Sequence, residues 1–160
     1  MKPKFSSLLV LSMEDYCKRH NIPCQRLNTN ALLIEQYAGS VRIVDAVILY
    51  RFSDGVVVID LKCDLVADDS EVIEVLLYHN AVNSAFTVGT PYLCPDCGEV
   101  RLCLLQRAKD ATLSDKEIEQ MLDCAIQPYN QHVSIVQNIL SGAVTLDDAI
   151  ESAMKAKVQP

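Results

Sequence analysis

The sequence predicts an α+β fold: an antiparallel five-stranded sheet with helices, in the order α-β-β-β-α-β-β-α, plus a C-terminal helical extension. Three observations lead to this prediction. The chain opens with helical periodicity, three extended runs follow with short connections, and two more extended runs follow the next helical segment. Strands that are linked as hairpins, rather than alternating with helices, are typical of an antiparallel sheet with helices packed on one side.

The N-terminal segment, residues 5–20, is predicted to be an amphipathic helix that ends at Asn21 and Pro23. Its apolar and aromatic residues recur at helical spacing and therefore share one face. These residues are Leu9, Met13, Tyr16, Cys17 and His20. A meander of three strands should follow, at residues 31–37, 41–52 and 56–63.

The next helix is predicted to start after a cap in Asp68-Asp69-Ser70 and to continue to about residue 85. Two further strands, at residues 87–93 and 99–106, should form a hairpin. After them, Ser114 and Glu117 have the spacing of a capping box, which gives the clearest helix start in the chain.

Pro128 lies within this third helical segment and lacks the backbone N–H that a helix interior needs. We therefore expect a kink or break near Gln127, with the helix resuming to about Leu140 and a last short helix from Thr145. Half of the 160 residues are hydrophobic, enough for one core. We expect residues 1–127 to form the α+β domain and residues 128–160 to form a helical extension that packs on it.

The net charge of −7 disfavours a nucleic-acid partner, because the phosphate backbone would be repelled. The apolar run near the N-terminus is too short for a secretory signal, and no run is long enough to cross a membrane. Seven cysteines without an export signal are expected to stay reduced. These features predict a cytoplasmic protein with no membrane partner.

The segment Cys94-Pro-Asp-Cys97-Gly98 admits three interpretations. It could be half of a zinc site, but Cys103 would lie about 13 Å up the strand at about 3.3 Å per residue, too far to be a third ligand. It could be a redox pair, but no helix N-terminus lowers the thiol pKa and Glu99 has the wrong charge. The favoured interpretation is a hairpin turn in which Gly98 adopts a positive φ.

The three histidines belong to no catalytic signature, and the five glycines form no nucleotide-binding pattern. His79 lies on an apolar helix face and should be a core or boundary residue. His20 and His132 are predicted to lie at the surface, near helix ends or turns. We therefore expect no enzymatic activity.

The second and third predicted strands carry apolar residues on both faces, more than one layer of helices can cover. Near the Asp54-Gly55 turn, the surplus comprises Val47, Leu49, Val56 and Val58. Exposed apolar patches usually bind a partner, so these four are the predicted partner-binding residues. The alternative is that the C-terminal helices wrap around the sheet and cover them.

Two short motifs resemble those of YbjN-like proteins. Asn80 and Asn83, in residues 76–83, resemble the paired asparagines of that family's central helix, and residues 98–102 resemble its next hairpin. The order of elements over about residues 5–127 is also similar, and that family resembles the class I type III secretion chaperones in fold. The resemblance implies an acidic cytoplasmic protein, often a homodimer, that binds another polypeptide and has no catalytic residues.

We therefore expect a non-enzymatic protein-binding module, chaperone-like or regulatory, that holds a client or partner polypeptide and forms a homodimer. No cofactor is expected. The alternative is a zinc-stapled or thiol-switch protein that uses Cys94 and Cys97 as metal ligands or as a redox pair.

Overall fold

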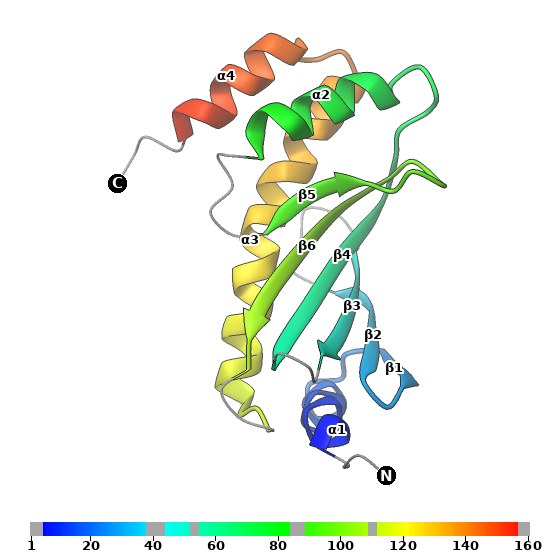
Figure 1. Cartoon of the computed structure of the whole chain (residues 1–160), viewed down its shortest axis with the longest axis vertical. Coiled ribbons are helices and arrows are strands. Elements are labelled where there is room, and N and C mark those ends of the chain that lie inside the picture. Colours follow the sequence, from blue (N-terminus) through cyan, green and yellow to red (C-terminus); the bar gives the residue numbers. More distant parts are fainter. Residues whose placement is uncertain (1–4, 38–43, 52–54, 84–88, 109–111, 157–160) are drawn as a thin grey trace.

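A computed structural model describes residues 5–37, 44–51, 55–83, 89–108 and 112–156. Within them, one antiparallel sheet packs against helices, so the predicted α+β class is confirmed (Figure 1). The helices are α1 (Phe5–Arg19), α2 (Val72–Val82), α3 (Asp115–Leu140) and α4 (Leu146–Ala156). The strands are β1 (Cys24–Asn28), β2 (Ala31–Tyr37), β3 (Val44–Arg51), β4 (Val56–Val66), β5 (Thr90–Leu93) and β6 (Glu99–Arg107).

Over the described residues, the sheet has six strands in the order β1-β2-β3-β4-β6-β5, so the predicted count of five was too low. The additional strand is β1, which pairs with β2 across a turn where the Asn30 N–H donates to the Asn28 side chain over 2.8 Å. Four of its five residues are exposed, and its sequence, CQRLN, has no apolar alternation. A strand with no buried face leaves no periodic pattern in the sequence.

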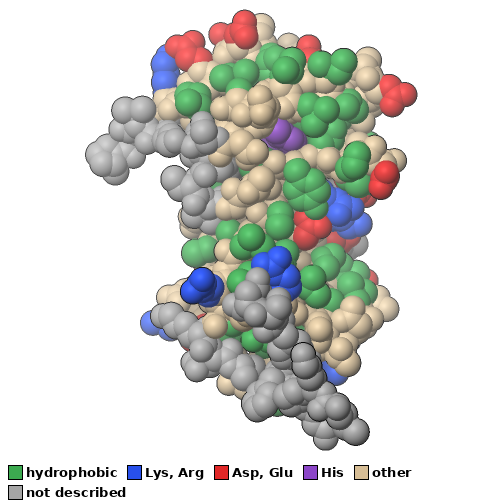
Figure 2. All heavy atoms as spheres, in the orientation of Figure 1, with side chains coloured by type: hydrophobic (Ala, Val, Ile, Leu, Met, Phe, Trp, Pro, Cys, Tyr) green, Lys and Arg blue, Asp and Glu red, His purple; other side chains and the backbone are tan. Residues whose placement is uncertain are grey.

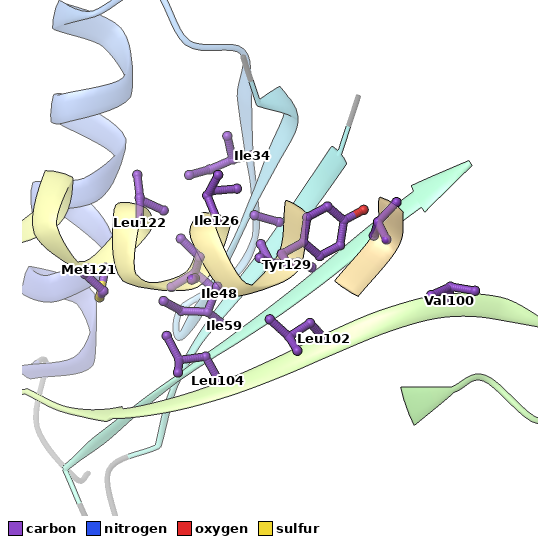
Figure 3. Close-up of a cluster of buried hydrophobic side chains, with 14 of the residues drawn as sticks. Ile34, Ile48, Ile59, Val100, Leu102, Leu104, Met121, Leu122, Ile126 and Tyr129 are labelled. Carbon is purple, nitrogen blue, oxygen red and sulfur yellow. The ribbon is translucent and has the colours of Figure 1, made fainter. Parts of the chain in front are cut away.

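The core lies between one face of the sheet and the helices α1 and α3. Helix α1 contacts β1, β2 and β3, whereas α3 contacts β4 and β6. Figure 3 shows side chains of α3 directed at those of the strands. The buried set drawn there includes Ile34, Ile48, Ile59, Leu102, Leu104, Met121, Leu122, Ile126 and Tyr129. Burying each such side chain contributes about 1.5–3 kcal/mol, so this layer is the main source of stability.

Helix α3 begins with the predicted capping box. The Ser114 Oγ accepts from the Glu117 N–H, and the Glu117 carboxylate accepts from the Ser114 N–H over 2.8 Å. The helix then continues through Pro128 to Leu140 without a break, so the predicted boundary between residues 127 and 128 lies inside α3. Helix α4 packs against α2 and α3, at the end of the molecule opposite α1 (Figure 1).

Two histidines meet in the interior where α2 packs on α3. His79 is buried, as predicted, but His132 is also fully buried, so its predicted surface position was wrong. The cause is the continuity of α3, because Tyr129, His132, Val133 and Val136 have helical spacing and form one buried stripe. The ring centroids of His79 and His132 are 4.8 Å apart, and the Tyr78 ring stacks on His132 at 5.9 Å.

Burial keeps both imidazoles neutral. It lowers the pKa of His79 to about 4, and burial together with the neighbouring His79 lowers the pKa of His132 to about 3. Among the residues that the structure describes, neither ring nitrogen of His79 has a hydrogen-bond partner, so none of these residues stabilises its protonated form through such a bond. The packing of α2 on α3 therefore depends on uncharged histidines.

We predict that the free energy of unfolding falls as the pH drops from about 6.5 to 5. Both histidines bind protons in the unfolded chain at about pH 6.5, but in the folded chain only at lower pH, so protonation favours unfolding. Each should contribute a slope of at most about 1.4 kcal/mol per pH unit, measured by urea denaturation. The double variant His79→Phe, His132→Phe should lose most of this slope, whereas the exposed control His20→Gln should keep it. A wild-type protein whose stability is constant over this range would contradict the prediction.

Candidate functional site

The candidate site is the outer face of the sheet, opposite the layer formed by α1 and α3. In the described part of the chain, α4 packs on α2 and α3, and Leu49 and Leu105 on the outer face remain 37% and 60% exposed. Figure 2 shows hydrophobic side chains exposed among charged ones over the strands and helices. In the described part of the chain, the C-terminal helices therefore do not cover this face, contrary to the alternative considered from the sequence.

All four predicted partner-binding residues lie on this face. Val47 and Leu49 flank the buried Ile48 in β3, and Val56 and Val58 flank the buried Val57 in β4. Of these four residues, Leu49 is exposed, and Val47, Val56 and Val58 are half-buried.

Strand pairing aligns three of the apolar side chains. Leu49 lies opposite Val58, and Val58 lies opposite Leu105 of β6, which makes a row across three adjacent strands. We call Leu49, Val58 and Leu105 the outer apolar row. Leu105 was missed from the sequence, although the doublet Leu104-Leu105 was a usable signal, since one of two consecutive strand residues must face outward.

One edge of the row is basic. Val56 lies opposite Arg51 of β3 and opposite Arg107 of β6, and both arginines are exposed. Burial raises the pKa of the Cys103 thiol on β6, and the charge of Arg51 opposes that shift. Arg51 follows Leu49 by two residues in β3, so both residues lie on the outer face.

The other side of the row is a polar cluster on β4, β5 and β6. The Tyr92 hydroxyl donates to Asp60 over 2.7 Å, and Arg101 donates to Asp60 over 3.2 Å and from its Nε to Glu99 over 3.0 Å. Arg101 holds the pKa of the Glu99 carboxyl below its usual range. Burial, followed by the bond to Asp60, raises the pKa of Tyr92 to about 12. These groups pair with one another, so they form a polar boundary beside the outer apolar row.

The segment between β5 and β6 is the predicted hairpin turn. The Cys94 N–H donates to the Glu99 carbonyl, and the Gly98 N–H donates to the Cys94 carbonyl, both over 2.9 Å. Gly98 has a φ of +70°, as expected. Cys103 lies well along β6, opposite Thr90 and Asp60.

The turn holds two of the ligands that zinc needs. Among the residues that the structure describes, no group of three or more His, Cys, Asp or Glu side chains is placed to bind a metal ion. A tetrahedral zinc site at Cys94 and Cys97 would therefore need further ligands, such as the same pair from a second copy.

The turn itself lowers the pKa of Cys94, contrary to the expectation from the sequence. The largest cause is the hydrogen bond with the Cys97 thiol, followed by the Asp96 N–H, with smaller contributions from the Cys97 N–H and the Arg101 charge. The same thiol pairing raises the pKa of Cys97. The expectation rested on the missing helix dipole and on the negative charge of Glu99, but the N–H groups of a tight turn stabilise an anion as a helix N-terminus does.

A hollow of about 120 Å³ lies between the end of β6 and the start of α3, beside Val57, Arg107, Leu113, Glu117 and Met121. Pockets for cofactors and drug-sized ligands are usually about 300–1,000 Å³. This hollow is too small for such a ligand. In the part of the chain described, no helix combines the length and apolar character needed to cross a membrane.

We predict that Gly98→Ala destabilises the protein far more than Gly55→Ala. Both glycines have a positive φ in hairpin turns, at +70° and +66°, so both variants incur about 1–2 kcal/mol of backbone strain. A Cβ at Gly98 would lie 2.4 Å from the Ala67 carbonyl oxygen, whereas a Cβ at Gly55 would meet none of the described residues within 4 Å. Urea denaturation should show a further loss of about 1–3 kcal/mol for Gly98→Ala. Equal losses would show that the turn is not held against β4.

Comparison with known proteins supports the fold. No family model and no curated protein matches the sequence. Among solved structures, the chain is similar to that of YbjN from E. coli, a proposed transcription regulator, with a TM-score of 0.54 and 12% sequence identity. The match covers 84% of this chain and 90% of that one. The chain therefore has a YbjN-like fold, as the sequence motifs implied.

Proposed function

We propose that this chain is a non-enzymatic protein-binding module that holds a regulatory partner or client polypeptide on the outer face of its sheet. The observation that carries the proposal is the outer apolar row, which places the exposed Leu49 and Leu105 on either side of Val58 across three paired strands. Aliphatic side chains that are aligned in this way and open to solvent are typical of an interaction surface.

The energetics favour a polypeptide partner. Covering the row would contribute about 25 cal/mol for each Å² of apolar surface removed from water, less the cost of ordering the partner. The strands fix the positions of the side chains in advance, so little of this free energy is lost in ordering the module itself.

The charges around the row support the same class of partner. With a net charge of −7, a nucleic-acid backbone would be repelled, whereas Arg51 and Arg107 at one edge would attract acidic side chains of a polypeptide. For YbjN itself, the role of transcription regulator is a proposal. If this chain regulates transcription, we propose that it does so through protein contacts.

A second copy of the chain is one candidate occupant of the row. In a symmetric dimer, the same row from each subunit would pack against its counterpart, because a two-fold interface pairs identical patches. A homodimer and a bound client remain compatible if they use different parts of the outer face.

We predict that the double variant Leu49→Glu, Leu105→Glu loses partner binding at least tenfold and keeps its fold. The matched control is Ile73→Glu, Leu77→Glu, which adds the same charges at residues of α2 that are 66% and 51% exposed. Sedimentation velocity measures self-association, and quantitative mass spectrometry of affinity-purified complexes measures capture of other polypeptides.

Both variants should unfold within about 1 kcal/mol of wild type, because substitutions at exposed sites usually change stability by at most about 0.5 kcal/mol each. If the α2 variant loses binding and the outer-row variant does not, the binding surface lies elsewhere. If neither loses it, the proposal is wrong.

A further inference from the structure

The hairpin turn brings two cysteines together on the protein surface. Cys97 is exposed and Cys94 is half-buried, and both are free thiols. The Gly98 N–H donates to the Cys94 carbonyl and the Cys94 N–H donates to the Glu99 carbonyl, both over 2.9 Å, so the two cysteines share one closed turn. A pair of this kind is suited either to binding a soft metal ion or to forming a disulfide.

Hydrogen bonds assign different roles to the two sulfur atoms. The Cys97 side chain lowers the pKa of Cys94 most, and the backbone N–H groups of Asp96 and Cys97 and the charge of Arg101 lower it further. The Cys94 side chain raises the pKa of Cys97 most, and the Glu99 carboxylate adds to that rise. Cys94 is therefore the sulfur stabilised as a thiolate, and Cys97 is the sulfur that stays protonated.

The number of available ligands favours the disulfide over the metal. Tetrahedral zinc needs four ligands, and the described residues bring no third His, Cys, Asp or Glu to the pair. A disulfide needs only the two sulfur atoms that the turn already holds together. Two other thiols are less reactive, because burial raises the pKa of Cys17 to about 12 and also raises the pKa of Cys103.

We propose that Cys94 and Cys97 form a reversible dithiol–disulfide pair whose oxidant is a small-molecule disulfide. The Cys94 thiolate attacks one sulfur of the oxidant, forming a mixed disulfide and releasing one small thiolate. Cys97 then loses its proton to water, and its sulfur attacks the Cys94 sulfur, releasing the second thiolate. The protein pair loses two electrons, the oxidant gains them, and one proton is released.

Oxidation would act beyond the turn. Arg101 and the Cys97 thiol both lower the pKa of Glu99, and Arg101 donates to Glu99 and to Asp60, which also accepts from Tyr92. A disulfide removes the S–H group of Cys97 and leaves Glu99 with Arg101 as its partner in this cluster. The pair is thus joined to the polar boundary of the outer apolar row, although the disulfide itself does not depend on partner binding there.

The test is a thiol–disulfide titration of the full chain. The protein is equilibrated in mixtures of reduced and oxidised glutathione, quenched with an alkylating agent and mapped by mass spectrometry. We expect one intramolecular disulfide between Cys94 and Cys97, with the loss of two hydrogen atoms, which reverts when reduced glutathione is restored.

Single variants separate the two roles. Cys97→Ser should accumulate a mixed disulfide between glutathione and Cys94, because no second sulfur resolves it. In Cys94→Ser, Cys97 should react with glutathione disulfide about tenfold more slowly than Cys94 does in the first variant. Cys124→Ser, which removes an exposed thiol outside the turn, should behave as wild type.

Three results would overturn the proposal. The pair could remain reduced, or remain as mixed disulfides, at every glutathione ratio. Cys97 could react as fast as Cys94. Elemental analysis of protein purified without chelator could find zinc that protects both thiols from alkylation, which would assign the turn to a metal site instead.

Discussion

One-sided coverage of the sheet is the constraint on which the rest of the structure depends. Helices α1 and α3 cover the face that carries Ile48, Ile59 and Leu102, and their burial there supplies the core. The strands that supply this face are also apolar on the opposite side, where no described helix takes a similar position. An antiparallel sheet tolerates one solvated face, but polar side chains usually occupy it. The aliphatic side chains found there instead are the reason to expect a partner.

Strand β4 carries apolar side chains on both of its faces. Val57 and Ile59 point into the core, whereas Val58 points outward between Leu49 and Leu105. Asp60, one pleat further along, already belongs to the polar cluster with Arg101 and Tyr92. The outer face therefore changes from apolar to polar within two residues of one strand, which gives the proposed binding surface a sharp edge.

Periodic patterns predicted most of the fold and the face of the sheet on which the four proposed partner-binding residues lie, because side-chain direction follows directly from strand pleat and helix turn. The alternation around Ile48 and Val57 is enough to place Val47, Leu49, Val56 and Val58 on one face. Such alternation does not identify the neighbour across the sheet. Leu105 joins the row through the pairing of β4 with β6, a contact between residues far apart in the sequence.

The errors share a physical cause, which is that tertiary structure overrides local signals. Strand β1 has no apolar alternation and is held by backbone pairing with β2. His132 was expected at the surface near a helix end or turn, yet α3 continues through Pro128 and buries this residue beside His79. The pKa of Cys94 was judged by the absence of a helix dipole, but hydrogen bonds within the turn lower it. Each of these three features depends on contacts with other residues of the chain, which the spacing of residue types does not identify.

The most direct test of the central claim is methyl NMR with a soluble paramagnetic agent, applied to the dilute chain and to its purified complex. The account predicts that the methyl groups of Leu49, Val58 and Leu105 are accessible to the agent in the free chain and protected in the complex, while those of Ile73 and Leu77 are accessible in both. Outer-row methyl groups that are already protected in the free chain, or that stay accessible in the complex, would contradict it.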